Sequence, residues 1–198
     1  MMQKCVALLG RRDTPTDAVE EYCRFLAAAL TVHGYEMEIA RVAWAERGWA
    51  AALAELKRDA LGWRGAPVLV QYTALAWSRR GFPLRVLRVL DILRDAGARV
   101  GVVFHDAEPF AGARVVDRLR RRAQLRVMRE ALRRARPVIF TLALDHVSWL
   151  PKQFGGAKFI PVGANLPEVA GLSRGPRVGA GDAGLTVAVF GVTGGAHG

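Results

Sequence analysis

The sequence predicts an α/β fold, with a parallel sheet of about six strands and helices on both of its faces. Apolar runs of strand length alternate with amphipathic segments at helical spacing, which is the order of a parallel sheet with helical crossovers. One of these runs, RVGVVF at 99–104, is almost wholly apolar, as expected for a strand buried on both faces. We therefore expect helices to cover both sides of the sheet.

The first strand and helix are predicted at the start of the chain. The apolar run 5–9 ends at Gly10 and is followed by a polar turn. Thr14 is predicted to be the N-cap of the next helix and Pro15 its first residue, because these residue types favour those positions. Apolar residues at helical spacing continue to Gly34, which is suited to end the helix.

The same alternation continues along the chain. Glycine and proline mark most of the boundaries between the predicted elements. The further strands are predicted at 36–42, 67–72, 99–104, 138–142 and 158–162, and the further helices at 46–61, 83–97, 113–136 and 145–150.

The composition changes after Asn165. Residues 166–184 are rich in glycine and proline and are predicted to be a linker. Residues 185–198 contain another apolar run, LTVAVF, followed by a glycine-rich turn. The sequence therefore predicts a domain of residues 1–165, a linker, and the first strand and turn of a second α/β domain, as expected for part of a longer two-domain protein.

Composition excludes several classes of protein. Hydrophobic residues make up 52% of the 198 residues and charged residues 24%, which excludes overall disorder. The two cysteines, Cys5 and Cys23, are too few for a disulfide framework. No apolar run has the length of a membrane span or of a signal peptide. A soluble cytoplasmic protein is expected.

Candidate binding residues follow the first predicted strand. Ligands of open α/β sheets bind outside the carboxyl ends of the strands. Gly10 and Arg11 occupy such a position, and the free amides of the helix that follows are suited to receive an anion. A loop with solvated charges is an equal alternative. The loop is neither a GxGxxG fingerprint nor a P-loop, which disfavours a simple dinucleotide or ATP site.

Tyr72 ends the predicted strand 67–72, with Gln71 and Thr73 beside it. An aromatic ring with amide and hydroxyl neighbours can stack on a sugar or a flat ring and hydrogen-bond to it. The alternative is that the nearby Trp77 and Phe82 only cover the edge of the sheet, and for these two residues we favour that interpretation.

His105 and Asp106 directly follow the most apolar strand. A histidine at the end of a central strand is held by a rigid element and can exchange hydrogen bonds with a ligand near neutral pH. A purely structural histidine is the alternative. The sequence contains no GxSxG, HExxH or Cys-x-x-Cys motif and no cluster with metal-ligand spacing, so hydrolase, thioredoxin and metal chemistry have no support.

Motifs stand in order at the ends of three predicted strands: LVQY at 69–72, followed by SRRGFP at 78–83, then VFHD at 103–106, and then IPVGANLP at 160–167. In this order they resemble the N-terminal half of GT-B glycosyltransferases, most closely the retaining enzymes of glycosyltransferase family 4. The resemblance covers nearly the whole chain.

The resemblance implies two Rossmann-like domains that face each other across a cleft. The N-terminal domain binds mainly the acceptor, and the C-terminal domain holds the nucleotide sugar. Gly10 then lies in the first loop of the cleft, His105 contacts the transferred sugar with Asp106 beside it, and Gly163 and Asn165 lead into the hinge. Two departures are visible: the first loop lacks the glycine pair common in the family, and aspartate stands at position 106 where many members have glutamate.

The function implied is the transfer of a sugar from a nucleotide sugar to an acceptor such as a lipid-linked or envelope polysaccharide precursor. The nucleotide sugar is a co-substrate, and neither a cofactor nor a metal is expected. Retaining transfer depends on stabilising the leaving diphosphate. The family residues for this are not among these 198, so the chain alone is expected to be inactive. The alternative is a non-catalytic α/β module that binds an anionic ligand or partner.

The positive charge gathers on one predicted helix. Lysine and arginine number 29 against 18 acidic residues, a net charge of +11, and ten arginines lie between Arg114 and Arg136. Val116 and Leu119 belong to the apolar stripe expected to face the sheet. The arginines either form a solvated face or attract an anionic membrane surface, placing the protein on the inner face of the membrane. No nucleic-acid-binding motif accompanies them, so no nucleic-acid partner is expected.

Overall fold

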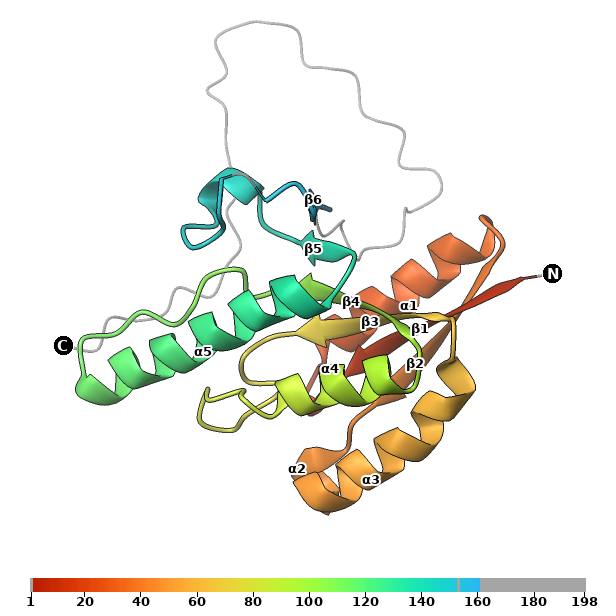
Figure 1. The fold of residues 1–198 in the computed structure, drawn as a ribbon, viewed down its shortest axis with the longest axis horizontal. Coiled ribbons are helices and arrows are strands. Elements are labelled where there is room, and N and C mark those ends of the chain that lie inside the picture. The colour runs from red at the N-terminus through yellow and green to blue at the C-terminus, as the bar shows by residue number, and fades with distance from the viewer. Residues whose placement is uncertain (1, 153, 161–198) are drawn as a thin grey trace, which may run out of the picture. The chain divides into compact units, whose positions relative to one another are not determined.

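A sheet of six parallel strands, in the order β2-β1-β3-β4-β5-β6, forms the centre of the computed structural model, which describes residues 2–152 and 154–160 (Figure 1). The predicted α/β fold is confirmed. The elements in chain order are β1 (Gln3–Leu9), α1 (Ala18–Thr31), β2 (Tyr35–Arg41), α2 (Trp44–Arg47), α3 (Trp49–Asp59), the 3₁₀ helix η1 (Ala60–Trp63), β3 (Pro67–Tyr72), α4 (Val86–Asp95), β4 (Arg99–Phe104), α5 (Val115–Arg134), β5 (Val138–Phe140), the 3₁₀ helix η2 (Leu144–His146) and β6 (Ala157–Phe159).

The two faces of the sheet are covered unequally. On one face, side chains of α3, α4 and α5 pack against alternate strand residues such as Val70, Val102 and Phe104 in one large core. On the other face α1 packs against β1 and β2 through a small cluster centred on Ala7, Leu9 and Cys23. This alternation follows from the period of two in a strand, since neighbouring side chains point to opposite faces.

The register of β3 and β4 determines which side chains meet at the carboxyl edge of the sheet. The strands pair along their whole length, so that Gln71 lies opposite Val103 and Tyr72 opposite Phe104. The amide of His105 donates to the carbonyl of Tyr72 at 3.0 Å, which extends the pairing by one residue. Since the pairing is parallel, both strands end at the same edge, and the residues that follow them are neighbours there.

The start of α1 differs from the prediction. The helix begins at Ala18, and its N-cap is Asp17, whose carboxylate accepts from the amide of Glu20 at 3.0 Å. Thr14 and Pro15 lie in the preceding loop. A tertiary contact favours Asp17 over Thr14 as the N-cap, because Arg41 at the end of β2 forms an ion pair with the same carboxylate at 3.0 Å.

Two other predicted helices are broken or shortened. The predicted helix 46–61 is divided at Gly48, whose φ of 77° belongs to the left-handed region that glycine tolerates. The predicted helix 145–150 is replaced by the short η2. There Trp149 packs against Phe104 and Phe140, and its indole N–H donates to the carbonyl of Ala107 at 2.7 Å, so tertiary contacts determine this backbone.

The apolar stripe of α5 faces the core only over the later turns of the helix. Val127, Met128, Ala131 and Leu132 are buried. Val116 and Leu119 are exposed, so their predicted packing against the sheet is wrong. The reason is length: twenty helical residues span about 30 Å, whereas the six residues of β4 span about 20 Å. The first turns of α5 reach past the strands (Figure 1).

The described residues all belong to the first of two compact units of the chain, residues 1–165. The predicted linker at 166–184, the predicted second-domain strand at 185–198, and the end of the strand predicted at 158–162 lie outside the described residues. None of the helices in the described part of the chain has both the length and the apolar character needed to span a membrane.

Candidate functional site

The carboxyl ends of β1, β3 and β4 converge on two cavities. A cavity of about 150 Å³ lies on the α1 side of the sheet and is lined by residues of the β1–α1 loop and by Gln71, Thr73 and Ala76. A larger cavity of about 630 Å³ is lined by the loops after β3 and β4 and by α5. Leu75 borders both cavities, so they are neighbours along the same edge of the sheet.

His105 is held in one orientation by Gln71. Nε2 of the imidazole lies 2.8 Å from Oε1 of the Gln71 amide, and the Nε2 amide group of Gln71 donates to the carbonyl of Leu69 at 3.1 Å. The second bond requires the nitrogen of Gln71 to face Leu69, which leaves its oxygen facing the histidine. An amide oxygen only accepts, so the histidine proton resides on Nε2 and Nδ1 is the acceptor.

Burial keeps His105 neutral. Desolvation lowers its pKa to about 4, against a smaller opposing influence from the carboxylate of Asp17. The ring of Tyr22 from α1 meets the imidazole edge-on with centroids 5.2 Å apart, which supplies part of this burial. At pH 7 the side chain is therefore an uncharged, oriented hydrogen-bonding group.

A charged network closes the α1 side of this region. Arg41 binds the carboxylates of Asp17 at 3.0 Å and Glu20 at 2.6 Å, and it also donates to the carbonyl of Gly10 at 2.8 Å. Burial is the largest single influence on the pKa of Asp17 and raises it, but hydrogen bonds from the amides of Glu20 and Asp13 and from Arg41 outweigh it. The net pKa of Asp17 is lowered. The first loop is thereby attached to both α1 and β2.

Gly10 is needed for close packing of the chain on itself. A Cβ at this position would lie 2.3 Å from the carbonyl oxygen of Ala76. The same carbonyl accepts from the amide of Arg11 at 2.7 Å and from the indole of Trp44 at 2.9 Å. Because Gly10 has no side chain, the β1–α1 loop lies close enough to the turn after β3 for Arg11 to form its hydrogen bond.

Arg11 lines the smaller cavity and is partly buried there. Its Nε is buried and has no hydrogen-bond partner among the described residues. A buried donor of this kind is costly unless water or a ligand satisfies it. Arg11 is therefore in a position to bind a ligand group that accepts hydrogen bonds.

Tyr72 lies on the other face of the sheet from His105. Its ring is 1% exposed and meets Phe104 edge-on with centroids 5.1 Å apart. Burial raises the pKa of its hydroxyl, and the nearby Asp106 carboxylate adds to this effect. Trp77 is also buried, and its indole donates to the carbonyl of Gln71 at 2.9 Å. Both aromatic rings pack in the core behind the edge of the sheet.

Asp106 faces the larger cavity. One carboxylate oxygen accepts from the amide of Ala74 at 3.1 Å, which ties the loop after β4 to the loop after β3. The surrounding protein raises the pKa of this carboxylate by desolvation, although the side chain still reaches solvent at the cavity. Asp106 and His105 thus follow one strand but differ in surroundings: Asp106 lines the larger cavity, whereas His105 contacts Gln71 and Tyr22.

The wall of the larger cavity is built by α5. Gln124 is 3% exposed; its amide nitrogen donates to the carbonyl of Gly81 at 3.0 Å, and its oxygen accepts from the amide of Phe110 at 2.7 Å. Arg120 donates to the carbonyl of Arg80 at 2.9 Å and lies over the ring of Phe110. Side chains of one helix therefore fix both loops that enclose this cavity.

The structure brings His105 together with Gln71, near the first loop that contains Gly10 and Arg11. It separates Tyr72 from this group, and Asn165 and Gly163 lie outside the described residues. Within residues 2–152 and 154–160, no three histidine, cysteine, aspartate or glutamate side chains gather to hold a metal ion.

The sequence analysis considered Gln71 only as an amide neighbour of Tyr72, and it did not place Tyr22 or Asp17 at the site. One signal for Gln71 is present in the sequence: it is the only polar residue in the strand PVLVQY, and such a residue in a buried strand needs a hydrogen-bond partner. Tyr22 and Asp17 carry no such signal, because their contacts with His105 and Arg41 are tertiary.

No family model matches the chain, and no curated protein matches it in sequence. The geometry at the strand ends is therefore the basis for assigning a function. That geometry combines an oriented neutral histidine, a partly buried arginine and two adjoining cavities at one edge of a parallel sheet.

Proposed function

We propose that the described domain is the acceptor-side half of a GT-B glycosyltransferase of the family 4 type. Such an enzyme moves a sugar from a nucleotide sugar to an acceptor with retention of configuration. The observation that carries the proposal is His105: it stands at the carboxyl edge of the sheet with Nε2 bound to Gln71 and Nδ1 left as an acceptor, and Gln71 itself lines the smaller cavity beside the first loop.

His105 acts in this proposal as an orienting group. A histidine with a pKa of about 4 is a weak base at neutral pH, so proton abstraction is not its role. Its neutral Nδ1 accepts a hydrogen bond from a hydroxyl of the transferred sugar. Gln71 fixes the tautomer, and Tyr22 restricts rotation of the ring. Such an arrangement positions the sugar before reaction.

The nucleotide and its diphosphate belong, in this proposal, to the C-terminal domain that the sequence predicts to begin near Leu185. The leaving diphosphate needs strong electrostatic stabilisation, commonly the largest contribution to catalysis. The smaller cavity offers the guanidinium of Arg11, but the carboxylates of Asp13 and Asp17 line the same cavity. We therefore expect the described domain to bind the acceptor and to need the second domain for transfer.

The acceptor is proposed to occupy the larger cavity. Arg79 and Arg80 on one wall suit an anionic group of the acceptor, and Asp106 on another suits a hydroxyl. The exposed ring of Phe110 offers an apolar surface at the rim. A phosphorylated or lipid-linked sugar precursor combines these three kinds of group.

The test is a transfer assay with a panel of nucleotide sugars, in which products are identified by mass spectrometry. The 198-residue chain is expected to yield no product, whereas a longer protein that includes a C-terminal domain is expected to transfer sugar. In that longer protein, His105→Ala should lower kcat/KM by about a hundredfold or more, the loss expected for a positioning group. His146→Ala is the matched control, because His146 is exposed and lines neither cavity. Full activity of His105→Ala would remove His105 from the site.

A second candidate is a non-catalytic module that binds an anionic ligand. The buried Nε of Arg11 in the smaller cavity favours it. The transfer assay tests the first candidate. If the longer protein shows no transfer, isothermal titration with inorganic phosphate tests the second. Binding that Arg11→Gln abolishes would support the module, and absence of both binding and transfer would exclude both functions.

A further inference from the structure

Exposed apolar side chains lie in the projecting first turns of α5 and in the loop just before them. These side chains, named here the α5 tip, are Phe110, Val115, Val116 and Leu119, which are 46%, 69%, 44% and 49% exposed. Single apolar side chains on a surface are ordinary. Val115 and Val116 lie four and three residues before Leu119 and are therefore its neighbours on the helix surface, and contiguous exposed apolar patches mark interaction sites.

The α5 tip is held in place by ordered contacts. The amide of Phe110 donates to the buried Gln124 at 2.7 Å, and the guanidinium of Arg120 lies 4.9 Å from the centre of its ring. The aromatic side chain is therefore fixed beside the first turns of α5. The cluster is a preformed surface that needs no ordering on binding.

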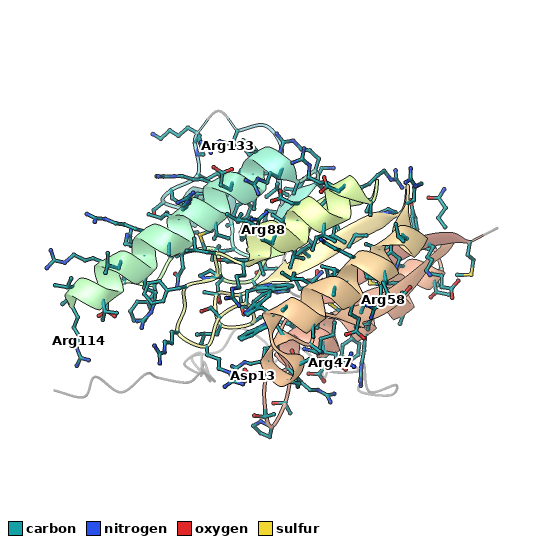
Figure 2. All side chains as sticks on the ribbon, turned by 60° about the horizontal axis from the view of Figure 1, so that its bottom comes forward. Asp13, Arg47, Arg58, Arg88, Arg114 and Arg133 are labelled. Atoms are coloured by element: carbon teal, nitrogen blue, oxygen red, sulfur yellow. The ribbon has the colours of Figure 1, made fainter. Side chains whose placement is uncertain are left out.

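A row of arginines continues from the tip along the outer side of the same helix. Arg118, Arg122, Arg126, Arg129 and Arg133 are all exposed. Their spacing of three or four residues places them on one side of the helix, over a length of about 22 Å. Figure 2 shows Arg114 and Arg133 at the two ends of α5. In the described structure, Arg133 pairs with Glu130, and none of the other four forms an ion pair.

We propose that α5 docks the protein on an anionic lipid bilayer, with the α5 tip inserted at the interface and the arginine row lying on the headgroups. An exposed helix that combines apolar and basic side chains on one side has the character of an interfacial helix. The positive row complements the negative surface potential of anionic membranes, and the long arginine stems can reach upward to phosphates while the tip is buried.

The apolar tip distinguishes a bilayer from a nucleic acid. A phosphate backbone would satisfy the arginine row equally well. It offers nothing to four exposed apolar side chains, of which only Phe110 is aromatic and suited to stack on a base. A bilayer satisfies both parts of the surface.

Docking in this orientation would also bring the membrane close to the larger cavity. Phe110 belongs to the α5 tip, and both Phe110 and Arg120 line the cavity. A bilayer that receives the tip therefore brings lipid headgroups to the mouth of the cavity. Membrane docking does not depend on the proposed glycosyl transfer: vesicle binding and transfer are separate measurements, and either can fail alone.

Vesicle co-sedimentation tests the proposal with the 198-residue chain. The protein should sediment with vesicles of phosphatidylcholine and phosphatidylglycerol in equal parts and remain in solution with phosphatidylcholine alone. Arg118→Gln/Arg122→Gln should weaken binding by more than tenfold, since each charge contributes about fivefold. Arg118→Lys/Arg122→Lys keeps the charge and should bind like the parent. Lys57→Gln/Arg58→Gln is the matched control on the exposed side of α3.

The apolar contribution is tested with Val115→Ser/Leu119→Ser. This variant should bind anionic vesicles roughly tenfold more weakly, because its apolar tip is lost while its charge is unchanged. Val32→Ser is the control, since Val32 is 81% exposed at the far end of α1. Circular dichroism and thermal unfolding check that each variant is folded.

Insertion is measured with a dye that fluoresces in apolar surroundings. Cys5 and Cys23 are 4% and 0% exposed, so a thiol-reactive dye will label Val115→Cys selectively in the folded protein. Anionic vesicles should brighten and blue-shift this dye, and spin-labelled lipid should quench it. The same dye on Val32→Cys should not respond.

Three results would overturn the proposal. The first is absence of sedimentation with anionic vesicles at low ionic strength. The second is sedimentation without any change in the dye at position 115, which would leave a purely electrostatic contact. The third is binding of duplex RNA in near-physiological salt by a protein that does not bind vesicles, which would make a nucleic acid the partner of the arginine row.

Discussion

Gln71 decides the chemical state of His105. Without a buried acceptor on Nε2, the imidazole would be free to change tautomer and orientation. The partner comes from the neighbouring strand, and the register of β3 and β4 determines that the two side chains meet. Each functional assignment at this residue therefore depends on a contact between residues 34 positions apart.

The buried His105 makes stability depend on pH. Its pKa is about 4 in the folded state and near 6.5 when exposed, so the unfolded chain binds an extra proton between these values. Stability is therefore lost as the pH falls from about 6.5 to about 4, by roughly 3 kcal/mol in total. Urea unfolding of the parent and of His105→Gln across this range measures the difference.

His105→Gln should lose less stability than the parent over that range, because it cannot take up this proton. Other groups titrate equally in both proteins, so the comparison isolates His105. Parallel stability curves for the two proteins would contradict the buried, neutral histidine.

Gly10→Ala should destabilise the protein. The added Cβ would stand 2.3 Å from the carbonyl oxygen of Ala76, which is backbone and has little freedom to move. The expected loss is about 1–3 kcal/mol of unfolding free energy, the usual range for overpacking. Gly62→Ala is the matched control, since nothing lies within 4 Å of a Cβ built there. Equal stability of the two variants would show that the loop moves freely away from Ala76.

At the scale of the elements, the sequence predicted the type and order of the helices and strands better than it predicted the residues at which they begin and end. The strands Pro67–Tyr72 and Arg99–Phe104 are found at their predicted positions, because composition and flanking residues both mark them. The start of α1 was predicted at Thr14 and Pro15, and the helix starts at Ala18. Local cap preferences allow either start, and the ion pair from Arg41 favours the later one.

Asp17→Ala should therefore weaken α1, whereas Thr14→Ala should not. Removing Asp17 loses the N-cap bond to Glu20 and one partner of Arg41, with an expected cost of about 1–2 kcal/mol. Thr14 is exposed, and its substitution should change stability by less than about 0.5 kcal/mol. Thermal or urea unfolding of both variants provides the measurement. A larger effect at Thr14 than at Asp17 would restore the N-cap expected from the sequence.

At the scale of the whole molecule, the unequal covering of the sheet predicts unequal local stability. Helix α4 has four buried apolar side chains, Val86, Val89, Leu90 and Leu93, in the large core. Helix α1 has one, Cys23, in the small cluster on the other face. Fewer buried contacts mean a lower free energy of local opening.

Hydrogen exchange measured by mass spectrometry should show this difference. Amides of α1 are expected to exchange at least about tenfold faster than those of α4, through local opening below the global unfolding free energy. Val89→Ala, at the centre of the large core, should speed exchange in α4 and leave the local opening of α1 little changed. Equal protection of α1 and α4 in the parent would contradict the separation into two unequal cores.

The location of the candidate site could be predicted in part from the order of the strands. Gly10, Arg11, His105 and Asp106 follow strands, and parallel strands of one sheet end at one edge, so their common location follows from the order of the elements. The face on which each side chain lies depends on register and on the loops. This is why Tyr72, one residue beyond Gln71, is buried on the opposite side.

The sequence by itself determined the fold class, the order of strands and helices and the concentration of arginine on one helix. These properties depend on local periodicity and composition, which each segment carries independently of the others. Only the tertiary structure decided where α1 begins, that Gln71 orients His105, and that the first turns of α5 reach past the sheet and expose Val116 and Leu119. Each of these depends on the distance between segments that are far apart in the chain, and that distance is set by strand register and by the relative lengths of helix and strand.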